Sequence, residues 1–357
     1  MRGSSQAGSP PCGGMAMTFS LIERVEAGHV LTCAEAEAAM EELLSGRVGT
    51  PEIVRLLAAL NRRPIAVQEL AGFARVMRRH ATRVFAEGEE RPANMVDTCG
   101  TGGDGANTFN ISTAAAIVAA AAGARVAKHG NRAASSRSGS ADVLEALGVR
   151  IDLPFERCGR AILEIGIGFL FAQAAHTATR HAAPARKQIG ARTVFNLLGP
   201  LTNPAGAQSQ VLGVFSEDVI DPVAATLAEL GVERAFVVHG AGGLDEISLA
   251  GETLVAEVRD GAIRRFTVTP DEFGVARAPL ESIRGGTAAE NAEIIRRALE
   301  GEPGPARDIV VVNAAAALVA AGIAANFREA AGLASFVISS GAASEKLASL
   351  AAFTGGT

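Results

Sequence analysis

Hydrophobic residues in the first quarter of the chain recur with the period of an amphipathic helix. Two runs show this spacing most clearly: Met40, Leu43 and Leu44, then Leu70, Phe73, Ala74 and Met77. Thr32, followed three residues later by Glu35, predicts a capping box at the start of one helix. No strand pattern occurs before Met95, so this part of the chain is predicted to form a small all-helical unit.

From Met95 onward, short apolar runs alternate with alanine-rich helical runs. The predicted strands include NMVDT, ARVAKHG, QVLGVF, RAFVVHG and DIVVV. Such alternation is typical of a largely parallel sheet covered by helices. We therefore predict an α/β fold, with a small all-helical domain and a larger α/β domain that has a largely parallel central sheet. Within Ile309–Ala325 we expect the IVVV run to form a strand, Asn313 to cap, and the remainder to form a buried helix.

Two segments lie outside this alternation. Residues 1–17 are rich in Gly, Ser and Pro and contain no apolar run, so we expect a disordered lead and not a signal peptide. The folded chain is then expected to start near Thr18. Residues 184–208 interrupt the strand–helix rhythm and are richer in Pro, Asn and basic residues.

Composition narrows the possible classes of protein. The chain has 357 residues, with 33 Lys and Arg against 38 Asp and Glu and a net charge of −5, whereas nucleic-acid-binding proteins usually carry a basic excess. We therefore expect no nucleic acid partner. We also expect no membrane span, because the apolar run Ala114–Ala124 is too short to cross a bilayer. The cysteines, Cys12, Cys33, Cys99 and Cys158, form no C-x-x-C pair, which predicts reduced thiols in a cytoplasmic protein.

Candidate chemistry begins with the stretch DTCGTGGDGANTFNIS, residues 97–112. It contains G-x-G-x-x-G, but no helix opens on the third glycine, and about 20 residues later stand Arg125 and Lys128 instead of the acid of a dinucleotide site. A glycine turn with free N–H groups is instead typical of an anion nest. Asn110-Ile111-Ser112-Thr113 then opens a helix whose N-terminus suits a second phosphate. The alternative is a tight turn between a strand and a helix, with no ligand.

A second strand ends in KHGNRAASSRSGSAD, residues 128–142. Lys128 and Arg132 add positive charge, and four serines add hydroxyl donors. If this strand lies beside the first, these groups face the crevice at the carboxyl ends of the strands, where open α/β sheets bind ligands. A solvated, serine-rich loop is the alternative interpretation.

Asp245 and Glu246 stand together in the glycine-containing loop VVHGAGGLDEISL. Mg²⁺ usually takes one or two carboxylates along with waters and substrate phosphates, so this pair is a candidate magnesium site. An exposed acidic pair without a ligand is the common alternative.

Together, DTCGTGGDG, NIST, KHGNRAASS, SGSADVLEALG, FNLLGPLTNP and the GLDE loop resemble the anthranilate phosphoribosyltransferase family. The likeness runs in order from about residue 18 to residue 353. It implies a helical domain formed by residues 18–88 and 184–208, which forms the homodimer and the anthranilate side. It also implies an α/β domain formed by residues 89–183 and 209–357, which binds 5-phosphoribosyl 1-diphosphate.

The resemblance also implies the site residues. The phosphoribosyl diphosphate site would comprise Gly100, Gly103, Asp104, Thr108, Asn110, Ile111, Ser112, Thr113, Lys128, His129, Gly130, Asn131, Arg132, Ala133, Ala134, Ser135, Ser136 and Ser140. Up to two Mg²⁺ ions would be held, one by Ser112 and Glu246 and the other by Asp245 and Glu246. Anthranilate would contact Gly100, Asn131 and Arg186, with His129 and His176 along its access route.

The activity that the resemblance implies is Mg²⁺-dependent transfer of the phosphoribosyl group to the amino group of anthranilate, a step of tryptophan biosynthesis. The sequence offers no obvious covalent nucleophile. Two alternatives stay open: a pyrimidine nucleoside phosphorylase, and a non-catalytic nucleic-acid-binding relative on the same fold. The chain departs from the family at Gln173, Thr177 and Thr179, which bear on the outer anthranilate channel.

Overall fold

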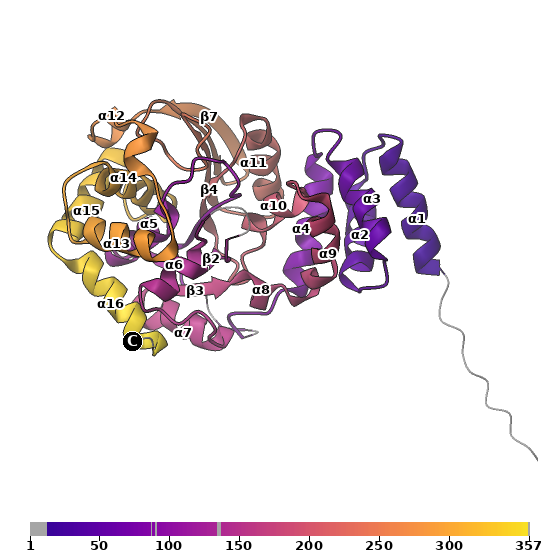
Figure 1. Ribbon diagram of the computed structural model, residues 1–357, viewed down its shortest axis with the longest axis horizontal. Coiled ribbons are helices and arrows are strands. Elements are labelled where there is room, and N and C mark those ends of the chain that lie inside the picture. The colour runs from indigo at the N-terminus through magenta and orange to yellow at the C-terminus, as the bar shows by residue number, and fades with distance from the viewer. Residues whose placement is uncertain (1–12, 87, 90, 134–136, 356–357) are drawn as a thin grey trace, which may run out of the picture.

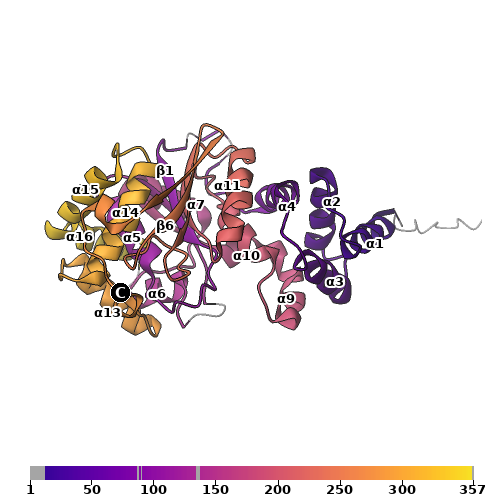
Figure 2. The same ribbon diagram turned by 90° about the horizontal axis from the view of Figure 1, so that it is seen from above.

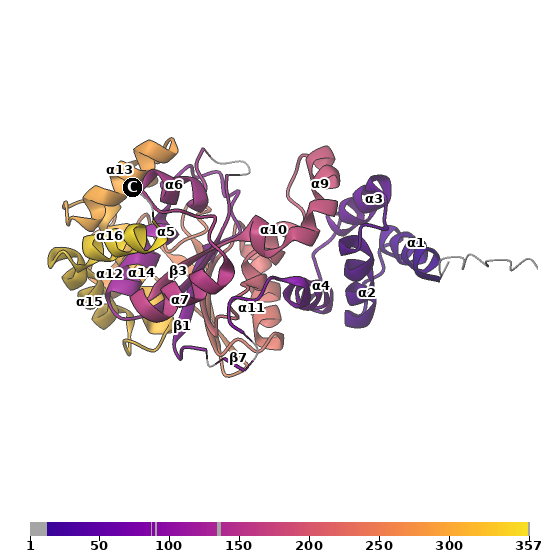
Figure 3. The same cartoon turned by 90° about the horizontal axis from the view of Figure 1, so that it is seen from below.

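The computed structural model describes residues 13–86, 88–89, 91–133 and 137–355, which form a helical part and a larger α/β part (Figure 1). The helical part is built from two separate segments of the chain. The first contains α1 (Gly13–Glu26), α2 (Cys33–Leu44), α3 (Thr50–Leu60) and α4 (Val67–His80). The second contains α8 (Ala172–Ala175), η1 (Thr177–His181), α9 (Ala183–Ile189), α10 (Val194–Leu198) and η2 (Pro200–Thr202), of which α9 lies against α3 (Figure 3).

The start of the helical part corrects one expectation. Helix α1 begins at Gly13, before Thr18, where we expected the folded chain to start. The Met15-Ala16-Met17 run consists of strong helix formers, which extends the helix toward the N-terminus. The predicted capping box of α2 is confirmed, because Thr32 N–H donates to Glu35 Oε2 at 2.9 Å and Glu35 N–H donates to Thr32 Oγ1 at 3.3 Å.

The larger part is built on a seven-stranded sheet with the order β3-β2-β1-β4-β5-β6-β7. The five strands from β3 to β5 pair in parallel, and β6 and β7 add an antiparallel hairpin. The strands are β1 (Met95–Gly100), β2 (Arg125–Gly130), β3 (Ile167–Phe171), β4 (Ser209–Gly213), β5 (Arg234–Gly240), β6 (Thr253–Arg259) and β7 (Ala262–Val268). The prediction of a largely parallel sheet is therefore confirmed.

Helices cover both faces of this sheet. Figure 2 shows α5 (Ile111–Ala121) and α14 (Pro305–Ala320) on one side, and α11 (Ile220–Glu229) on the other, between the sheet and the helical part. The remaining helices are α6 (Ser140–Ala146), α7 (Phe155–Ile165), η3 (Glu217–Val219), α12 (Pro270–Phe273), η4 (Leu280–Ile283), α13 (Ala288–Leu299), α15 (Phe327–Ser339) and α16 (Ala342–Thr354). None of the described helices is both long enough and apolar enough to cross a membrane.

Helix α14 contradicts the predicted strand in the IVVV run. Residues 309–312 are helical, and Asn313 is a buried residue inside the helix instead of a cap. Every residue from Ile309 to Ala320 is buried, so the helix is apolar on all sides and its sequence shows no helical period. A short run of β-branched residues cannot then be distinguished from a buried strand by pattern alone.

The two larger hydrophobic cores of the described residues hold the fold together. One lies between α5, α14 and the sheet, and alanines dominate it. The other begins in α1 to α4, continues through α11, and reaches sheet residues such as Leu212, Val237 and Ala256. Because this second core crosses from the helical part to the sheet, apolar packing joins the two parts of the molecule.

Candidate active site at the strand ends

The glycine turn follows β1 at the point where the connections from the sheet change direction. Strands β2 and β3 lie on one side of β1, whereas β4 and β5 lie on the other. Gly100, the last residue of β1, pairs with Gly213, the last residue of β4. Open α/β sheets bind ligands in the crevice beyond the carboxyl ends of such strands.

The backbone of the turn has the geometry of an anion nest. Gly102, Gly103 and Gly105 have φ of 66°, 73° and 79°, and Asn107 has φ of 53°. Such left-handed residues direct successive N–H groups into a concave surface. A distant segment supports the turn, because Gly285 N–H donates to Asn107 O at 2.8 Å and Thr108 forms a bridge with Arg284.

Asp245 and Glu246 reach this turn from the loop between β5 and β6. Asp245 Oδ2 accepts from Gly102 N–H at 2.8 Å, and Glu246 Oε1 accepts from Ser112 N–H at 3.0 Å in the first turn of α5. Asp104 is close by, since its Oδ2 accepts from Asp245 N–H at 3.4 Å. A Cβ at position 100 would overlap the Asp245 carboxylate, so the close approach requires glycine there.

The acidic pair is electrostatically strained. Desolvation, together with the nearby charge of Asp104, raises the pKa of Asp245 to about 7. Desolvation and repulsion from Asp245 raise the pKa of Glu246 to about 8, although Lys128 acts in the opposite direction. Carboxylates that repel each other in a desolvated site are stabilised by a bound cation.

Lys128 lies beside the glycine turn, as the sequence predicted. Strand β2 is the parallel neighbour of β1, and Lys128 Nζ donates to Thr98 O at 2.6 Å and lies 3.4 Å from Ser112 Oγ. Its side chain is only 3% exposed, and this desolvation lowers the pKa of its ammonium group. The end of β2 therefore places a buried cation at the N-terminus of α5.

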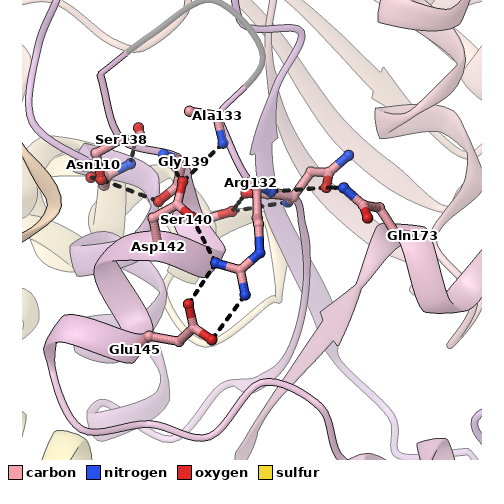
Figure 4. A network of polar contacts seen from close by, with 10 residues as sticks. Asn110, Arg132, Ala133, Ser138, Gly139, Ser140, Asp142, Glu145 and Gln173 are labelled. Atoms are coloured by element: carbon pink, nitrogen blue, oxygen red, sulfur yellow. Dashed lines mark hydrogen bonds and ion pairs between the residues drawn. The ribbon is translucent and has the colours of Figure 1, made fainter. Parts of the chain in front are cut away.

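The loop after β2 is organised by one carboxylate (Figure 4). Asp142 Oδ2 accepts from the backbone N–H groups of Ala133 and Gly139, both at 2.9 Å, and Oδ1 accepts from Arg132 Nη1 at 2.9 Å. One carboxylate thus joins the beginning and the end of the loop. Ala134, Ser135 and Ser136, predicted to bind phosphoribosyl diphosphate, lie outside the described residues.

The other predicted residues of this loop form a second set of contacts. Arg132 also contacts Glu145 of α6 at 2.6 and 2.9 Å, so its guanidinium is directed to α6 (Figure 4). Ser140 Oγ accepts from Asn131 N–H at 3.2 Å, and Asn110 Nδ2 donates to Ser138 O at 3.1 Å. Gly130 ends β2, while Ile111 and Thr113 are buried in the first turn of α5.

The residues predicted to line the anthranilate route are only partly brought together. The rings of His129 and His176 meet edge to face with centroids 5.3 Å apart. Burial lowers the pKa of His129 to about 3 and that of His176 to about 4. Arg186 lies on α9, with its guanidinium 5.3 Å from the Phe195 ring centroid, and no contact of the described residues links it to Gly100 or Asn131.

The departures from the family pattern lie on this same side. Gln173 Nε2 donates to Asn131 Oδ1 at 3.2 Å, which fixes the amide of a residue predicted to contact anthranilate (Figure 4). Thr179 Oγ1 donates to His176 O at 2.7 Å, and Thr177 begins η1. Gln173 and Thr179 therefore contact two of the residues predicted to bind anthranilate or line its route, Asn131 and His176.

Sequence reasoning missed three residues that build the site. Buried Asp97 accepts from His129 N–H at 3.1 Å and from Asn203 Nδ2 at 2.8 Å, which ties the LTNP segment to the strand ends. Arg192 reaches the glycine turn from the helical part, with Nη1 donating to Gly103 O at 2.6 Å. Asp97 stands in the quoted DTCG motif and was available as a signal, whereas Arg192 carries no local signal.

Comparison with known proteins defines the class of this fold and site. Residues 92–344 match the profile of the glycosyl transferase family, a/b domain, and residues 19–81 match the helical bundle domain of the glycosyl transferase family. The chain is 52% identical over 335 residues to an anthranilate phosphoribosyltransferase from Symbiobacterium thermophilum, covering 94% of this chain and 97% of that protein. The chain therefore belongs to the anthranilate phosphoribosyltransferase family.

Solved structures agree with this assignment. The crystal structure of anthranilate phosphoribosyltransferase from Thermus thermophilus is similar with a TM-score of 0.87 and 48% identity, covering 93% of this chain and 98% of that one. The Saccharomyces cerevisiae enzyme, solved in complex with PRPP and Mg, is similar with a TM-score of 0.85 and 28% identity over 95% and 98% of the two chains. Membership of this family disfavours a nucleoside phosphorylase and a non-catalytic nucleic-acid-binding relative.

Proposed function

We propose that the chain transfers the phosphoribosyl group of 5-phosphoribosyl 1-diphosphate to the amino group of anthranilate, in a Mg²⁺-dependent reaction that releases diphosphate. The observation that carries this proposal is the meeting of Asp245, Glu246 and Lys128 with the glycine turn at the strand ends. Together they provide acidic metal ligands, a buried cation and backbone donors within one crevice. A sugar with two phosphorylated positions needs this combination.

The diphosphate side of the site would comprise residues 98–113, 128–133, 137–142 and 245–246. The N–H groups at Gly103 and Asp104 would donate to phosphate oxygens, and residues 110–113 would contact the ligand at the start of α5, where Ser112 N–H already donates to Glu246 Oε1. Lys128 adds the positive charge, and Ser140 adds a hydroxyl donor. Helix N-termini and nests bind anions through such N–H groups, so no basic excess over the whole chain is required.

The residues present fit magnesium. Asp245 and Glu246 are acceptor-only ligands with pKa values raised by desolvation and by neighbouring carboxylates, which a dication would relieve. The described residues include no group of three or more His, Cys, Asp and Glu side chains that could hold a metal unaided, and Mg²⁺ usually completes its shell with waters and phosphates. We propose that Ser112 and Glu246 hold one ion, and Asp245 and Glu246 the second. When bound, magnesium neutralises charge on the departing diphosphate.

The anthranilate side comprises residues 172–203 together with His129 and Asn131. Arg186 would pair with the carboxylate of anthranilate, and Gly100 and Asn131 would contact its ring and amine. The neutral His129 and His176 rings would line the route by which it arrives. Bond cleavage at C1 of the ribose passes through an oxocarbenium-like state, so the protein would act by holding the amine against C1 and excluding water.

The assembly and the compartment belong to the same proposal. We propose a homodimer that forms through the helical domain and acts in the cytoplasm. The described cysteines, Cys33, Cys99 and Cys158, are free thiols, which agrees with a reducing compartment. Mass measurement in solution, by light scattering at several protein concentrations, tests the dimer.

One assay tests the reaction. Purified protein with Mg²⁺, phosphoribosyl diphosphate and anthranilate should consume anthranilate, followed by loss of its fluorescence. The signal should disappear when a chelator removes the metal. Consumption of thymidine with phosphate, and none of anthranilate, would contradict the proposal.

A further inference from the structure

Arg192 contacts both parts of the molecule. Its Nη1 donates to Gly103 O in the glycine turn at 2.6 Å, and its guanidinium carbon lies 4.3 Å from the ring centroid of Phe215. The planar guanidinium therefore has an aromatic face behind it and a turn carbonyl at its tip. Stacking of this kind, together with the hydrogen bond, orients the arginine side chain.

The main chain of Arg192 is held by the helical part. Asn61, which caps the C-terminus of α3, donates from Nδ2 to Arg192 O at 2.7 Å. Arg192 also follows Arg186 by six residues, and helix α9, which carries Arg186, packs against α3. The backbone of Arg192 thus belongs to the same unit as Arg186.

The tip of Arg192 is held by the strand ends. Phe215 follows β4, and its backbone N–H donates to Thr101 Oγ1 at 3.0 Å. Thr101 N–H in turn donates to Gly213 O at 2.9 Å. The ring under the guanidinium and the carbonyl that it contacts are therefore parts of one platform, next to the residues proposed to bind diphosphate.

We propose that Arg192 is a positioning residue that fixes the Gly103 peptide for diphosphate binding and links the glycine turn to the helical part. This inference rests on the proposed transfer reaction. The Gly103–Asp104 peptide contributes the Asp104 N–H to the nest, so holding Gly103 O sets the direction of that donor. A movement of the helical part that breaks the contact between Arg192 and Gly103 O would release the glycine turn. The Arg192 side chain therefore couples the diphosphate side to the anthranilate side.

The test compares steady-state constants for both substrates in wild type, Arg192→Ala, Arg192→Lys and Phe215→Leu. Arg192→Ala should raise KM for phosphoribosyl diphosphate about tenfold, with less than a threefold change in KM for anthranilate and an unchanged thermal midpoint. Arg192→Lys keeps the charge and loses the planar stack, so it should recover part of the loss. Phe215→Leu should raise the same KM by roughly threefold.

Arg62→Ala is the matched control, because Arg62 is an exposed arginine beside Asn61 and its removal changes the net charge equally. It should leave both KM values unchanged, which separates the contact from general attraction of an anionic substrate. An active wild type with an unaffected Arg192→Ala variant, or with equal changes in both KM values, overturns this inference alone. A wild type that does not consume anthranilate overturns the proposed function, and the inference with it.

Discussion

The two sides of the active site are built differently. On the proposed diphosphate side, contacts within the α/β part hold Asp245 at Gly102, Glu246 at Ser112 and Lys128 at Thr98. Arg192 is the exception, because it reaches Gly103 O from the helical part. On the anthranilate side, Arg186 stacks on Phe195 within its own segment, and contacts across the site come from Gln173 and His176. The acidic pair and Lys128 are therefore preorganised, whereas the proposed anthranilate side depends more heavily on how the helical part meets the strand ends.

This difference indicates which requirement of the proposed reaction each domain would meet. Charge that develops on a leaving group is stabilised best by donors and cations that need not move when it appears. An incoming arylamine must instead enter, be oriented and be enclosed, which requires one wall that can shift. We propose that the diphosphate side and the anthranilate side match these two requirements.

Removing the acidic pair should have the largest effect on the preorganised side. In Asp245→Asn with Glu246→Gln, the metal ligands are lost and kcat/KM should fall by roughly a thousandfold or more. Added Mg²⁺ should not restore turnover, as measured by anthranilate consumption. Thermal stability should be kept or rise, because desolvation and repulsion raise the pKa of both carboxylates in the folded state. Near-normal turnover would contradict the metal role.

Arg186→Ala should affect the anthranilate side selectively. We expect KM for anthranilate to rise roughly thirtyfold, because a charge-assisted contact to its carboxylate is lost, while KM for phosphoribosyl diphosphate changes less than threefold. Lys187→Ala, at the next residue of α9, is the control and should leave both values unchanged. If Arg186→Ala weakened both substrates equally, the separation of the two sides would be wrong.

Asp142→Ala should weaken the preorganised side without touching the metal ligands. Three donors from Arg132, Ala133 and Gly139 lose their common acceptor, so the loop after β2 loses its fixed ends. KM for phosphoribosyl diphosphate should rise about tenfold, measured with anthranilate saturating. Asp152→Asn, which alters an exposed pair with Arg150, should match wild type. An unchanged KM in Asp142→Ala would show that phosphoribosyl diphosphate binding does not depend on the hydrogen bonds that Asp142 accepts from the loop.

Acid should destabilise the protein through the histidine pair. Burial lowers the pKa of His129 to about 3 and that of His176 to about 4, from an ordinary 6.5. Between pH 4 and pH 6.5, the unfolded chain therefore binds more protons than the folded one, so the free energy of unfolding falls as the pH falls. From pH 7 to pH 5 each histidine contributes roughly 2 kcal/mol to this loss.

Urea unfolding of His176→Asn at both pH values should show a smaller loss between pH 7 and pH 5 than wild type. The exposed His29→Asn variant is the control and should keep the wild-type loss. The same loss in His176→Asn as in wild type would show that the buried ring takes up no fewer protons than an unfolded one.

Much of the preorganised side could be predicted because its residues stand in short contiguous motifs. The glycine turn, the NIST helix start and the KHGN loop each follow a strand, so one topological rule predicts that they converge. The helical part was likewise predicted from its period. Within Ile309–Ala320 the prediction from periodicity failed, because a helix that is buried on all sides shows no helical period. Its β-branched residues suggested a strand instead.

Other features depend on tertiary structure that no short motif encodes. Arg192 contacts Gly103 across 89 positions of the chain, and Asn203 contacts Asp97 across 106. The β6–β7 hairpin is a different case, since Asp260-Gly261 between two β-rich runs is a strong turn signal that our prediction did not use. Both of these residues have positive φ, 50° and 79°, as a tight hairpin of this type requires.

Strand β7 ends the sheet with an exposed row of polar groups. Along this edge Arg264 pairs with Glu257 at 2.8 Å, and Arg265 pairs with Asp221 at 2.8 Å. Pairing the β7 edge with the edge of another sheet would bury these cations. Charged residues on an edge strand are a common natural protection against aggregation. We therefore expect the hairpin to hinder pairing of this sheet with the sheet of a neighbouring molecule.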